Sequence, residues 1–482
     1  MPLWQFCRGV KGLPGAIEPI DWPTKTLTLD GGRFTHTHAV SFDRLVLALG
    51  GVTDLSAGPG LVNYRWPGRF SVGETLNAQF AGVRTGFHRA LQPTSLARVP
   101  EKGYQRNPTM NSSRFCRYIF FIATAAVLAA RERPHHVVLI TIDGLRWQEV
   151  FRGAEEALMT TDKTAGGGVP AGSLTALKAD FLADTPEERR RKLMPFFWGT
   201  LVPAGQAFGN RDLGSAARVL NAERISYPGY NELLTGALDP LITSNMPIPN
   251  RNVTVLEWLH GRPGFAGRVG AAAAWRVFAP IINVGRSRLP VFVTQQHSAP
   301  GTVSPRISEL ERMMDDIPPI TPEENFDAFV YYATLDLMDT LRPRVFLLAL
   351  GEPDEWAHAR RYDRYLYSIQ RCDRFIRQLW EKLQADPEYR GTTSFVLSSD
   401  HGRGVTPEDW IGHNKKIPHA EETWIAAIGP AVPALGERRN VAEVHQAQVA
   451  ATVAALVGEN FRAAFPAAAE PIADVVRGPA AK

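Results

Sequence analysis

One segment predicts the core of this protein: His135-His136-Val137-Val138-Leu139-Ile140-Thr141-Ile142-Asp143-Gly144. Its five apolar residues, interrupted only by Thr141, lead directly into a carboxylate and a glycine. An apolar run rich in Val and Ile is typical of a strand that is buried on both faces. Asp143 would then lie at the carboxyl end of that strand, where open parallel sheets bind their ligands. Taken alone, the same pattern also fits an ordinary Asp-Gly turn.

The pattern recurs twice in the second half of the chain. Ser394-Phe395-Val396-Leu397-Ser398-Ser399 leads into Asp400-His401-Gly402, and Arg344-Val345-Phe346-Leu347-Leu348-Ala349-Leu350 leads into Asp354 and His358. Three apolar runs that each end in acidic or imidazole side chains favour one shared site over three unrelated turns.

Length and composition set broad limits. With 482 residues, 44% hydrophobic and 21% charged, the chain is globular in type and long enough for two or three domains, or for one large domain with an appendage. The net charge is only +4, and no run of Lys and Arg is longer than Arg189–Lys192. The sequence therefore does not indicate a nucleic-acid-binding surface. The three cysteines, Cys7, Cys116 and Cys372, are too far apart for a disulfide framework or a zinc knuckle.

Residues 1–109 differ in character from the rest. Segments 16–21 and 25–32 predict a short antiparallel pair with a glycine turn, and a buried strand is expected over 42–51. Through "FDRLVLALG", residues 9–62 resemble an internal piece of flavin-dependent pyridine-nucleotide oxidoreductases of the NADH dehydrogenase type. That family's opening GxGxxG loop is missing, so we do not expect an active flavoenzyme. The region is predicted to be an oxidoreductase-like fragment or a spurious N-terminal extension.

The segment that begins at Met110 has the layout of a secretory signal peptide. A short basic stretch, 111–117, precedes thirteen apolar or small residues, 118–130, with a small-residue cleavage site at 127–129. Thirteen residues are too few to span a bilayer comfortably, and a buried connecting helix would also fit the segment. If Met110 is the true start, the protein is predicted to be periplasmic or secreted; otherwise the sequence leaves its location open.

Residues 131–482 alternate apolar strands with helical stretches, which predicts a mostly parallel sheet with helices on both faces. Segment 154–184 is expected to be a loop or cap insertion, and 262–322 a strand around 291–293 with irregular structure. We expect helices at 186–194, 323–341, 361–385 and 441–457.

The acidic and imidazole residues suit a metal centre. Asp354 and His358 are four residues apart and would face the same way on a helix. His413 follows Asp400 and His401. Together with Asp143 these groups offer three carboxylates and three imidazoles, which suits two divalent ions of the zinc type.

A nucleophile is available at Ser226, in Ile225-Ser226-Tyr227-Pro228-Gly229-Tyr230. A serine hydroxyl reacts poorly at neutral pH, but a bound cation lowers its pKa. Serine before Tyr-Pro also fits a helix N-cap. The two interpretations are compatible, because a helix N-terminus offers N–H donors to an anion.

Residues 135–430 resemble the alkaline phosphatase superfamily, in particular its type I phosphodiesterase and nucleotide pyrophosphatase branch. The resemblance lies in "ITIDGLRWQEVF", "ISYPGYNELLTG", "GEPDEWAH", "SSDHGRG" and "WIGHNKK…ETWIAAIGP", in matching order and spacing. It implies an alkaline-phosphatase-like α/β fold: a central, mostly parallel sheet flanked by helices, with cap insertions. The appended N-terminal fragment would lie outside this catalytic domain, predicted for residues 131–482.

The resemblance also implies roles for single residues. Ser226 falls at the position of the nucleophile, and Asn245 near that of an asparagine that contacts a phosphoryl oxygen. His419 competes with His413 for the last ligand position, which His413 fits better by its distance from Gly429-Pro430. The implied ligands are Asp143, Ser226, Asp400 and His401 for one ion, and Asp354, His358 and His413 for the other.

The predicted function is metal-dependent hydrolysis of a small-molecule phosphate ester. A sulfatase of the same superfamily would need a C/S-x-P-x-R pattern, whereas Tyr230 occupies the fourth position after Ser226. The same residues would also suit a phosphomutase of this superfamily or a catalytically inactive metal-binding protein. Preference for monoesters or diesters, the leaving group and the oligomeric state are not determined by the sequence.

Overall fold

The computed structural model describes residues 16–17, 26–30, 38–41, 53–54, 63–64, 135–164, 166–294 and 304–476. The chain divides into two units, Met1–Ser112 and Ser113–Lys482. The signal-like segment 110–130, the predicted strand 42–51 and the predicted domain boundaries lie outside the described residues, so these remain predictions, as does the location of the protein. No helix in the described ranges combines the length and the apolar character that crossing a membrane requires.

In the first unit, the predicted antiparallel pair is present. Strand β1 (Ala16–Ile17) pairs with β2 (Thr26–Asp30), which pairs on its other side with β3 (His38–Ser41), both antiparallel. A separate antiparallel pair joins β4 (Thr53–Asp54) to β5 (Asn63–Tyr64).

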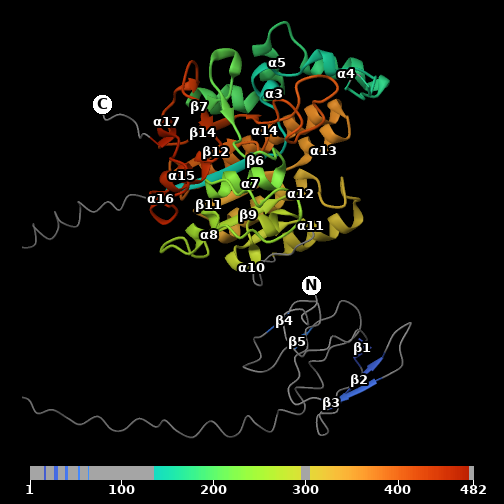
Figure 1. The fold of residues 1–482 in the computed structure, drawn as a ribbon, viewed down its shortest axis with the longest axis vertical. Helices are drawn as coiled ribbons and strands as arrows, with labels where there is room; N and C mark the ends of the chain where they lie inside the picture. Colours follow the sequence, from blue (N-terminus) through green and yellow to red (C-terminus); the bar gives the residue numbers. More distant parts are fainter. Residues whose placement is uncertain are drawn as a thin grey trace, which may run out of the picture. The chain divides into compact units, whose positions relative to one another are not determined.

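The second unit is built on an eight-stranded sheet in the order β10-β9-β11-β6-β12-β14-β7-β15. The first five strands pair in parallel, and β14 alone runs against its neighbours. Figure 1 shows the labelled strands from β9 to β7 following one another through the middle of this unit. The bounds are β6 His136–Ile142, β7 Gly205–Phe208, β9 Val269–Ala273, β10 Val291–Val293, β11 Val345–Leu350, β12 Thr393–Ser398, β14 Ile425–Ile428 and β15 Gly436–Glu437.

Side chains of the central strands alternate between two hydrophobic cores. In β6, Val138, Ile140 and Ile142 enter one core, and Val137 and Leu139 enter the other. A strand covered by helices on both faces can carry an unbroken apolar run, so the fold class predicted from this segment, a mostly parallel α/β sheet flanked by helices, is confirmed.

Two groups of helices cover the two faces of the central sheet. The core on one face of the sheet takes side chains from α3 (Trp147–Arg152), α4 (Leu174–Phe181), α5 (Pro186–Leu193), α11 (Pro305–Asp316), α12 (Asp327–Leu341), α13 (Glu352–His358) and α14 (Tyr362–Ala385). The core on the other face takes them from α7 (Ser226–Thr235), α8 (Val255–His260), α9 (Phe278–Ile281), α15 (Gln448–Leu456), α16 (Phe461–Ala464) and α17 (Ala473–Val476). Two further short helices are α6 (Val202–Ala204) and α10 (Val284–Ser287).

A small three-stranded sheet completes the unit. Strand β8 (Ala217–Arg218) pairs with β13 (Glu422–Thr423) and with β16 (Val444–His445). Because residues 444–445 form β16, the helix expected over 441–457 begins only at Gln448.

Two other expectations need correction. The segment 154–184, expected to be a loop or cap insertion, contains α4, whose Leu177 and Phe181 are four residues apart and fully buried. The segment 262–322, expected to hold one strand and irregular structure, also contains β9 and the helices α9, α10 and α11. Strand β9 has the sequence Val-Gly-Ala-Ala-Ala, in which Val269 is the one branched residue typical of strands, yet it pairs with β10 and β11.

Candidate active site

The turn after β6 positions Asp143, the first candidate ligand of the site. The backbone N–H of Asp143 donates to the carbonyl oxygen of Leu350 at 2.9 Å, and that of Gly144 donates to Oδ1 of Asp400 at 3.2 Å. Gly144 has φ +61°, and a Cβ there would lie 2.3 Å from Oδ1 of Asp354. Only glycine allows this turn to approach Asp354 so closely.

Asp400 and His401 follow β12, the parallel neighbour of β6. Both side chains are fully buried. Nε2 of His401 lies 3.2 Å from Oδ2 of Asp400 and 3.5 Å from Oδ1 of Asp143. Asp143, Asp400 and His401 therefore converge closely enough to hold one cation.

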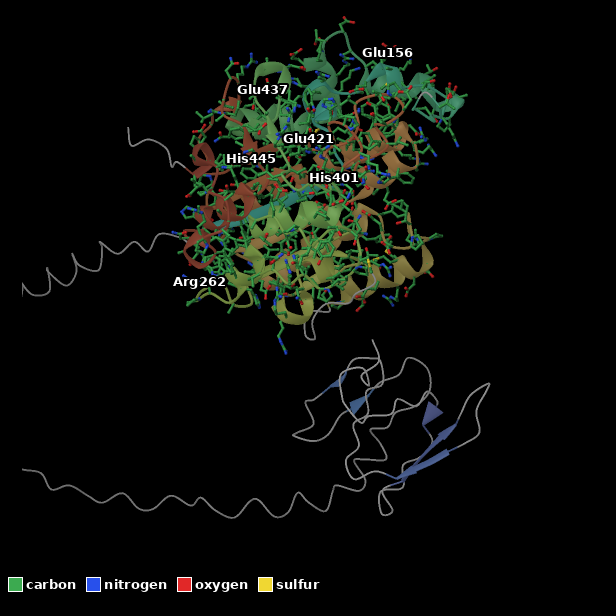
Figure 2. All side chains as sticks on the ribbon, in the orientation of Figure 1. Glu156, Arg262, His401, Glu421, Glu437 and His445 are labelled. Carbon is green, nitrogen blue, oxygen red and sulfur yellow. The ribbon has the colours of Figure 1, made fainter. Side chains whose placement is uncertain are left out.

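The second group comes from α13, which follows β11, and from the loop after Asp400. Nε2 of His358 lies 3.0 Å from Oδ2 of Asp354 and 3.0 Å from Nε2 of His413. Oδ1 of Asp354 lies 3.7 Å from Nε2 of His413 and 3.9 Å from Nε2 of His401. Asp354, His401 and His413 thus form a second group able to hold a cation, with His358 directly beside it. Figure 2 shows His401 in the interior of the unit.

The two buried imidazoles are oriented for coordination. Nδ1 of His401 lies 3.0 Å from the carbonyl oxygen of Gly402, and Nδ1 of His413 lies 3.1 Å from that of Arg224. A carbonyl oxygen only accepts, so each Nδ1 is the donor, and in this tautomer Nε2 is available to bind a cation beside the carboxylates. Metal-ligating histidines are typically oriented in this way.

The carboxylates have the unsatisfied atoms that a cation would occupy. Oδ1 of Asp143 and Oδ2 of Asp400 are buried and have no hydrogen-bond partner among the described residues. Burial, Asp400 and Asp354 raise the pKa of Asp143 well above its usual range. Orphaned oxygens, imidazole lone pairs and crowded carboxylates together fit divalent metal ions.

Ser226 is the first residue of α7, and its Oγ lies 3.3 Å from Nε2 of His401. The N-cap position belongs to Ile225, and no side chain caps the helix there, so the alternative N-cap role of Ser226 is not seen. Gly229 allows α7 to lie against the end of β12, because a Cβ there would meet the carbonyl oxygen of Asp400 at 2.4 Å. The serine hydroxyl therefore lies beside the first group of ligands.

Asn245 is held next to the start of the same helix. Its Oδ1 accepts a hydrogen bond from the backbone N–H of Tyr227 at 2.9 Å, and the hydroxyl of Tyr227 donates to the carbonyl oxygen of Ile248 at 2.6 Å. The structure thus brings Asn245 close to Ser226. His419, the competing ligand, is half exposed and lies 3.0 Å from Oε1 of Glu422, apart from the two groups.

The structure also shows two supporting residues that the sequence motifs do not reveal. The hydroxyl of Tyr230 donates to Oδ2 of Asp143 at 3.0 Å. Arg403 is fully buried, donates to the carbonyl oxygen of Asp354 at 3.1 Å and contacts the carboxylate of the same residue. Burial alone would raise the pKa of Asp354, but Arg403 and the neighbouring histidines hold it well below its usual range. Both residues lie within the quoted motifs, Tyr230 four positions after Ser226 and Arg403 three positions after Asp400, but the motifs do not indicate which residues they contact.

Residues 254–473 match the model of the family described as type I phosphodiesterase / nucleotide pyrophosphatase. The match covers Asp354, His358, Asp400, His401 and His413, and the predicted family resemblance is confirmed there. No curated protein matches the chain.

Several solved structures resemble the chain at low identity. Ps i-CgsB, crystallised with k-i-k-neocarrahexaose, is 17% identical, with a TM-score of 0.45 over 71% of this chain and 75% of that one. Wild-type alkaline phosphatase PafA is 10% identical, with a TM-score of 0.44 over 72% of this chain and 100% of that one. The phosphonate monoester hydrolase SpPMH from Silicibacter pomeroyi is 13% identical, with a TM-score of 0.42 over 72% and 78%.

The contact between Tyr230 and Asp143 leads to a first prediction. Replacing Tyr230 with Phe removes the hydrogen bond that orients the carboxylate, and we expect the affinity for a zinc ion held by Asp143, Asp400 and His401 to fall about 10- to 100-fold. Titration of the metal-depleted protein with zinc and a competing chelator measures this. Tyr367→Phe, which loses only a bond to the exposed Asp180, is the control. Equal zinc affinities in both variants would contradict the role of Tyr230.

Proposed function

We propose that the protein is a metal-dependent hydrolase of phosphate esters that uses Ser226 as nucleophile and two divalent ions, most simply zinc. The observation that carries the proposal is the convergence of two ligand groups, which share His401, beside the Oγ of Ser226. The family match of residues 254–473 supports the same reaction class.

The proposed ligand sets are based on the two groups, with Ser226 added to the first and His358 in place of the shared His401 in the second. Asp143, Ser226, Asp400 and His401 would hold one ion. Asp354, His358 and His413 would hold the other. Three carboxylates and one serine alkoxide would bring two dications close to neutrality, which lets a phosphate ester approach. When bound, the ions would polarise the phosphoryl oxygens and lower the pKa of the serine hydroxyl.

The chain's own residues would carry the reaction in two displacements. The Oγ of Ser226 attacks phosphorus, the bond to the ester oxygen breaks, and the leaving group departs as an alcohol or phenol after taking up a proton. A phosphoseryl residue remains. Water then attacks phosphorus, the bond to Oγ breaks and Oγ takes up a proton from that water, which releases inorganic phosphate from a monoester substrate or a phosphate monoester from a diester.

Asn245 is suited to contact the phosphoryl group. Because its Oδ1 is engaged by the N–H of Tyr227, its amide nitrogen is left to donate to a phosphoryl oxygen next to Ser226. This hydrogen bond would strengthen as negative charge builds up on that oxygen in the transition state.

The segment around Asn245 suits an apolar leaving group. Leu238, Leu241, Met246 and Ile248 are all exposed, with Leu241 71% and Met246 60% accessible. Large apolar side chains that gather on the surface beside a reactive group usually contact a substrate or a partner. Aryl esters are therefore the natural first substrates to test.

The predicted nucleophile can be removed without touching the other ligands. We expect Ser226→Ala to abolish hydrolysis of an aryl phosphate ester, at least about 1,000-fold, while the protein still binds zinc through its carboxylates and imidazoles. Steady-state rates and the metal content after gel filtration measure this. Ser244→Ala, a nearby exposed serine, is the matched control and should keep full activity. Undiminished turnover in Ser226→Ala would exclude the serine as nucleophile.

Metal dependence gives a separate prediction. Incubation with a chelator should inactivate the protein, and added zinc should restore the rate, because the proposed ligands are carboxylates, imidazoles and one serine oxygen, from which a strong chelator can remove the ions. A preparation that hydrolyses aryl phosphate at the same rate after exhaustive chelation, with metal absent by elemental analysis, would contradict the proposal.

The main alternative function, that of a sulfatase, can be distinguished by comparing the hydrolysis of phosphate and sulfate esters. Tyr230 takes the place of the arginine that the sulfatase pattern requires, and its hydroxyl is bound to Asp143. Aryl phosphate monoester, aryl phosphate diester and aryl sulfate, assayed side by side, should show hydrolysis of at least one phosphate ester and at least about 100-fold slower hydrolysis of the sulfate. A preference for the sulfate would replace the proposed function with that of a sulfatase.

A further inference from the structure

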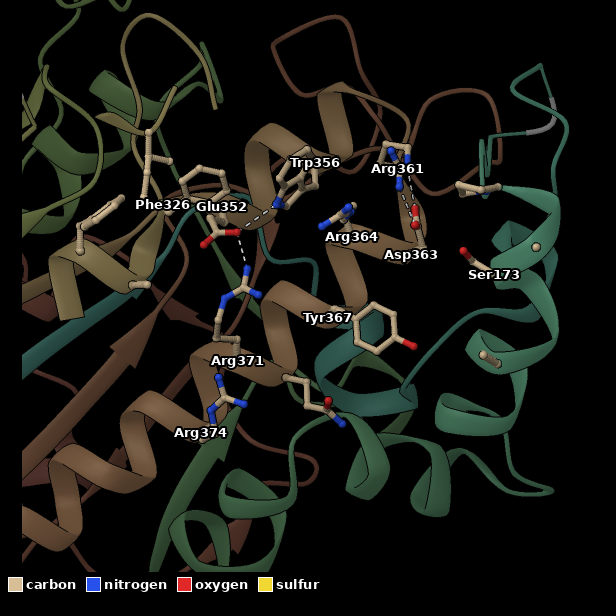
Figure 3. A pocket seen from close by; sticks show the side chains of 17 residues that line it. Ser173, Phe326, Glu352, Trp356, Arg361, Asp363, Arg364, Tyr367, Arg371 and Arg374 are labelled. Carbon is tan, nitrogen blue, oxygen red and sulfur yellow. Dashed lines mark hydrogen bonds and ion pairs between the residues drawn. The ribbon is translucent and has the colours of Figure 1, made fainter. Parts of the chain in front are cut away.

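A pocket lies beside α13 (Figure 3), and no candidate metal ligand is among the residues that line it. Its volume is about 920 Å³, and residues of α4, α12, α13 and α14 line it. Trp356 of α13 faces this pocket, whereas Asp354 and His358, two residues before and after it, belong to the active site. Residues two apart on a helix point in nearly opposite directions, so the two sites use opposite faces of α13.

The pocket is rich in arginine, and some of that charge is already paired. Arg361 donates to Asp363 at 2.8 and 2.7 Å, and Arg371 donates to the buried Glu352. Glu352 also accepts a hydrogen bond from Nε1 of Trp356 at 3.1 Å. Figure 3 draws these contacts as dashed lines. These contacts hold the walls of the pocket in place, and the ion pairs neutralise the positive charges of Arg361 and Arg371.

Two further arginines on the pocket wall have no such partner. Arg364 and Arg374 are exposed, and neither makes a hydrogen bond or an ion pair with any residue that the structure describes. They lie on the same face of α14 as Tyr367 and Arg371, at spacings of three and four residues. A guanidinium group presents a planar set of N–H donors that matches phosphate, sulfonate or carboxylate groups. The pocket therefore has unused capacity for anions.

The rest of the lining is aromatic. The guanidinium of Arg364 lies 5.7 Å from the ring centre of Trp356, and Phe326, Phe329 and Tyr367 also line the pocket. Arg364 and Arg374 are ten residues apart, which is about 15 Å along the helix axis. One small anion cannot bridge that length easily, whereas an elongated aromatic molecule with an anionic group near each end can.

We propose that the pocket lined by Arg364, Arg374 and Trp356 is a binding site for an elongated aromatic ligand that carries two anionic groups. The free guanidinium groups recognise the anions, and the aromatic side chains stack against the body of the ligand. The site is separate from the proposed active site and does not depend on the metal ions or on Ser226.

Fluorescence titration of the full-length protein with the aromatic disulfonate bis-ANS tests this proposal. Excess inorganic phosphate is kept present to occupy the proposed active site. Arg364→Gln combined with Arg374→Gln should weaken bis-ANS binding about tenfold or more, because each lost guanidinium removes a charge-assisted hydrogen bond. Ala176→Trp, which places a large side chain on the opposite wall, should weaken binding as well.

The matched control removes the same charge elsewhere. Arg377 and Arg390 are exposed and do not line the pocket, so Arg377→Gln combined with Arg390→Gln should leave bis-ANS affinity unchanged. The uncharged dye N-phenylnaphthylamine should bind the wild type and the Arg364/Arg374 variant equally well. Equal bis-ANS affinities in the wild type and the Arg364/Arg374 variant, or an equal loss in the control variant, would overturn the proposal.

Discussion

Mutual repulsion among buried carboxylates is the constraint on which this site depends. Asp143, Asp354 and Asp400 gather at the ends of β6, β11 and β12, and Asp400 is fully buried. Among the described residues, Arg403 is the one lysine or arginine that forms an ion pair with any of them. Burying uncompensated charge costs several kcal/mol per group, so these carboxylates are stabilised either by protonation or by added positive charge. Two divalent cations would supply it, and the same charge would then make the site reactive towards phosphate esters.

The sheet determines where these groups meet, and their neighbours determine how they point. Three adjacent parallel strands are followed by loops at one edge of the sheet, which places Asp143 and Asp400 in one ligand group and Asp354 in the other, with His401 common to both. Tyr230 orients Asp143, and Arg403 orients Asp354. The start of α13 is fixed in turn by Asp327, whose carboxylate accepts from the N–H of Gly351 at 2.7 Å. Much of the precision of the site thus comes from residues that would never touch the substrate.

The sequence revealed the parts of the structure that have a local signature. The apolar runs at 137–142 and 345–350 predicted two central strands, and the residues that follow them pointed to the site. The helix expected over 361–385 begins one residue later, at Tyr362, and ends as predicted because its apolar residues recur with helical spacing. Strand β9 was missed because small residues form it, and Gly270 packs tightly against Pro290 and Phe346. That close fit depends on tertiary contacts that no local pattern encodes.

Side-chain contacts between residues far apart in the chain could not be predicted from the sequence either. Nothing in the motif around Asp400 indicates that Arg403, three residues later, reaches back to Asp354, 49 residues earlier in the chain. The spacing around Asn245 likewise does not show that its Oδ1 accepts a hydrogen bond from the backbone N–H of Tyr227, the residue after Ser226. The predicted ligands converge in the structure, and the proposed cations would satisfy the carboxylate oxygens that the described residues leave without partners.

The most direct test is anomalous X-ray diffraction at the zinc absorption edge from crystals of the protein grown with zinc. The account predicts two peaks beside Ser226. One should lie about 2.0–2.3 Å from the ligand atoms of Asp143, Asp400 and His401, and the other at the same distance from those of Asp354, His358 and His413. Absence of both peaks, or zinc bound only at other residues, would contradict it.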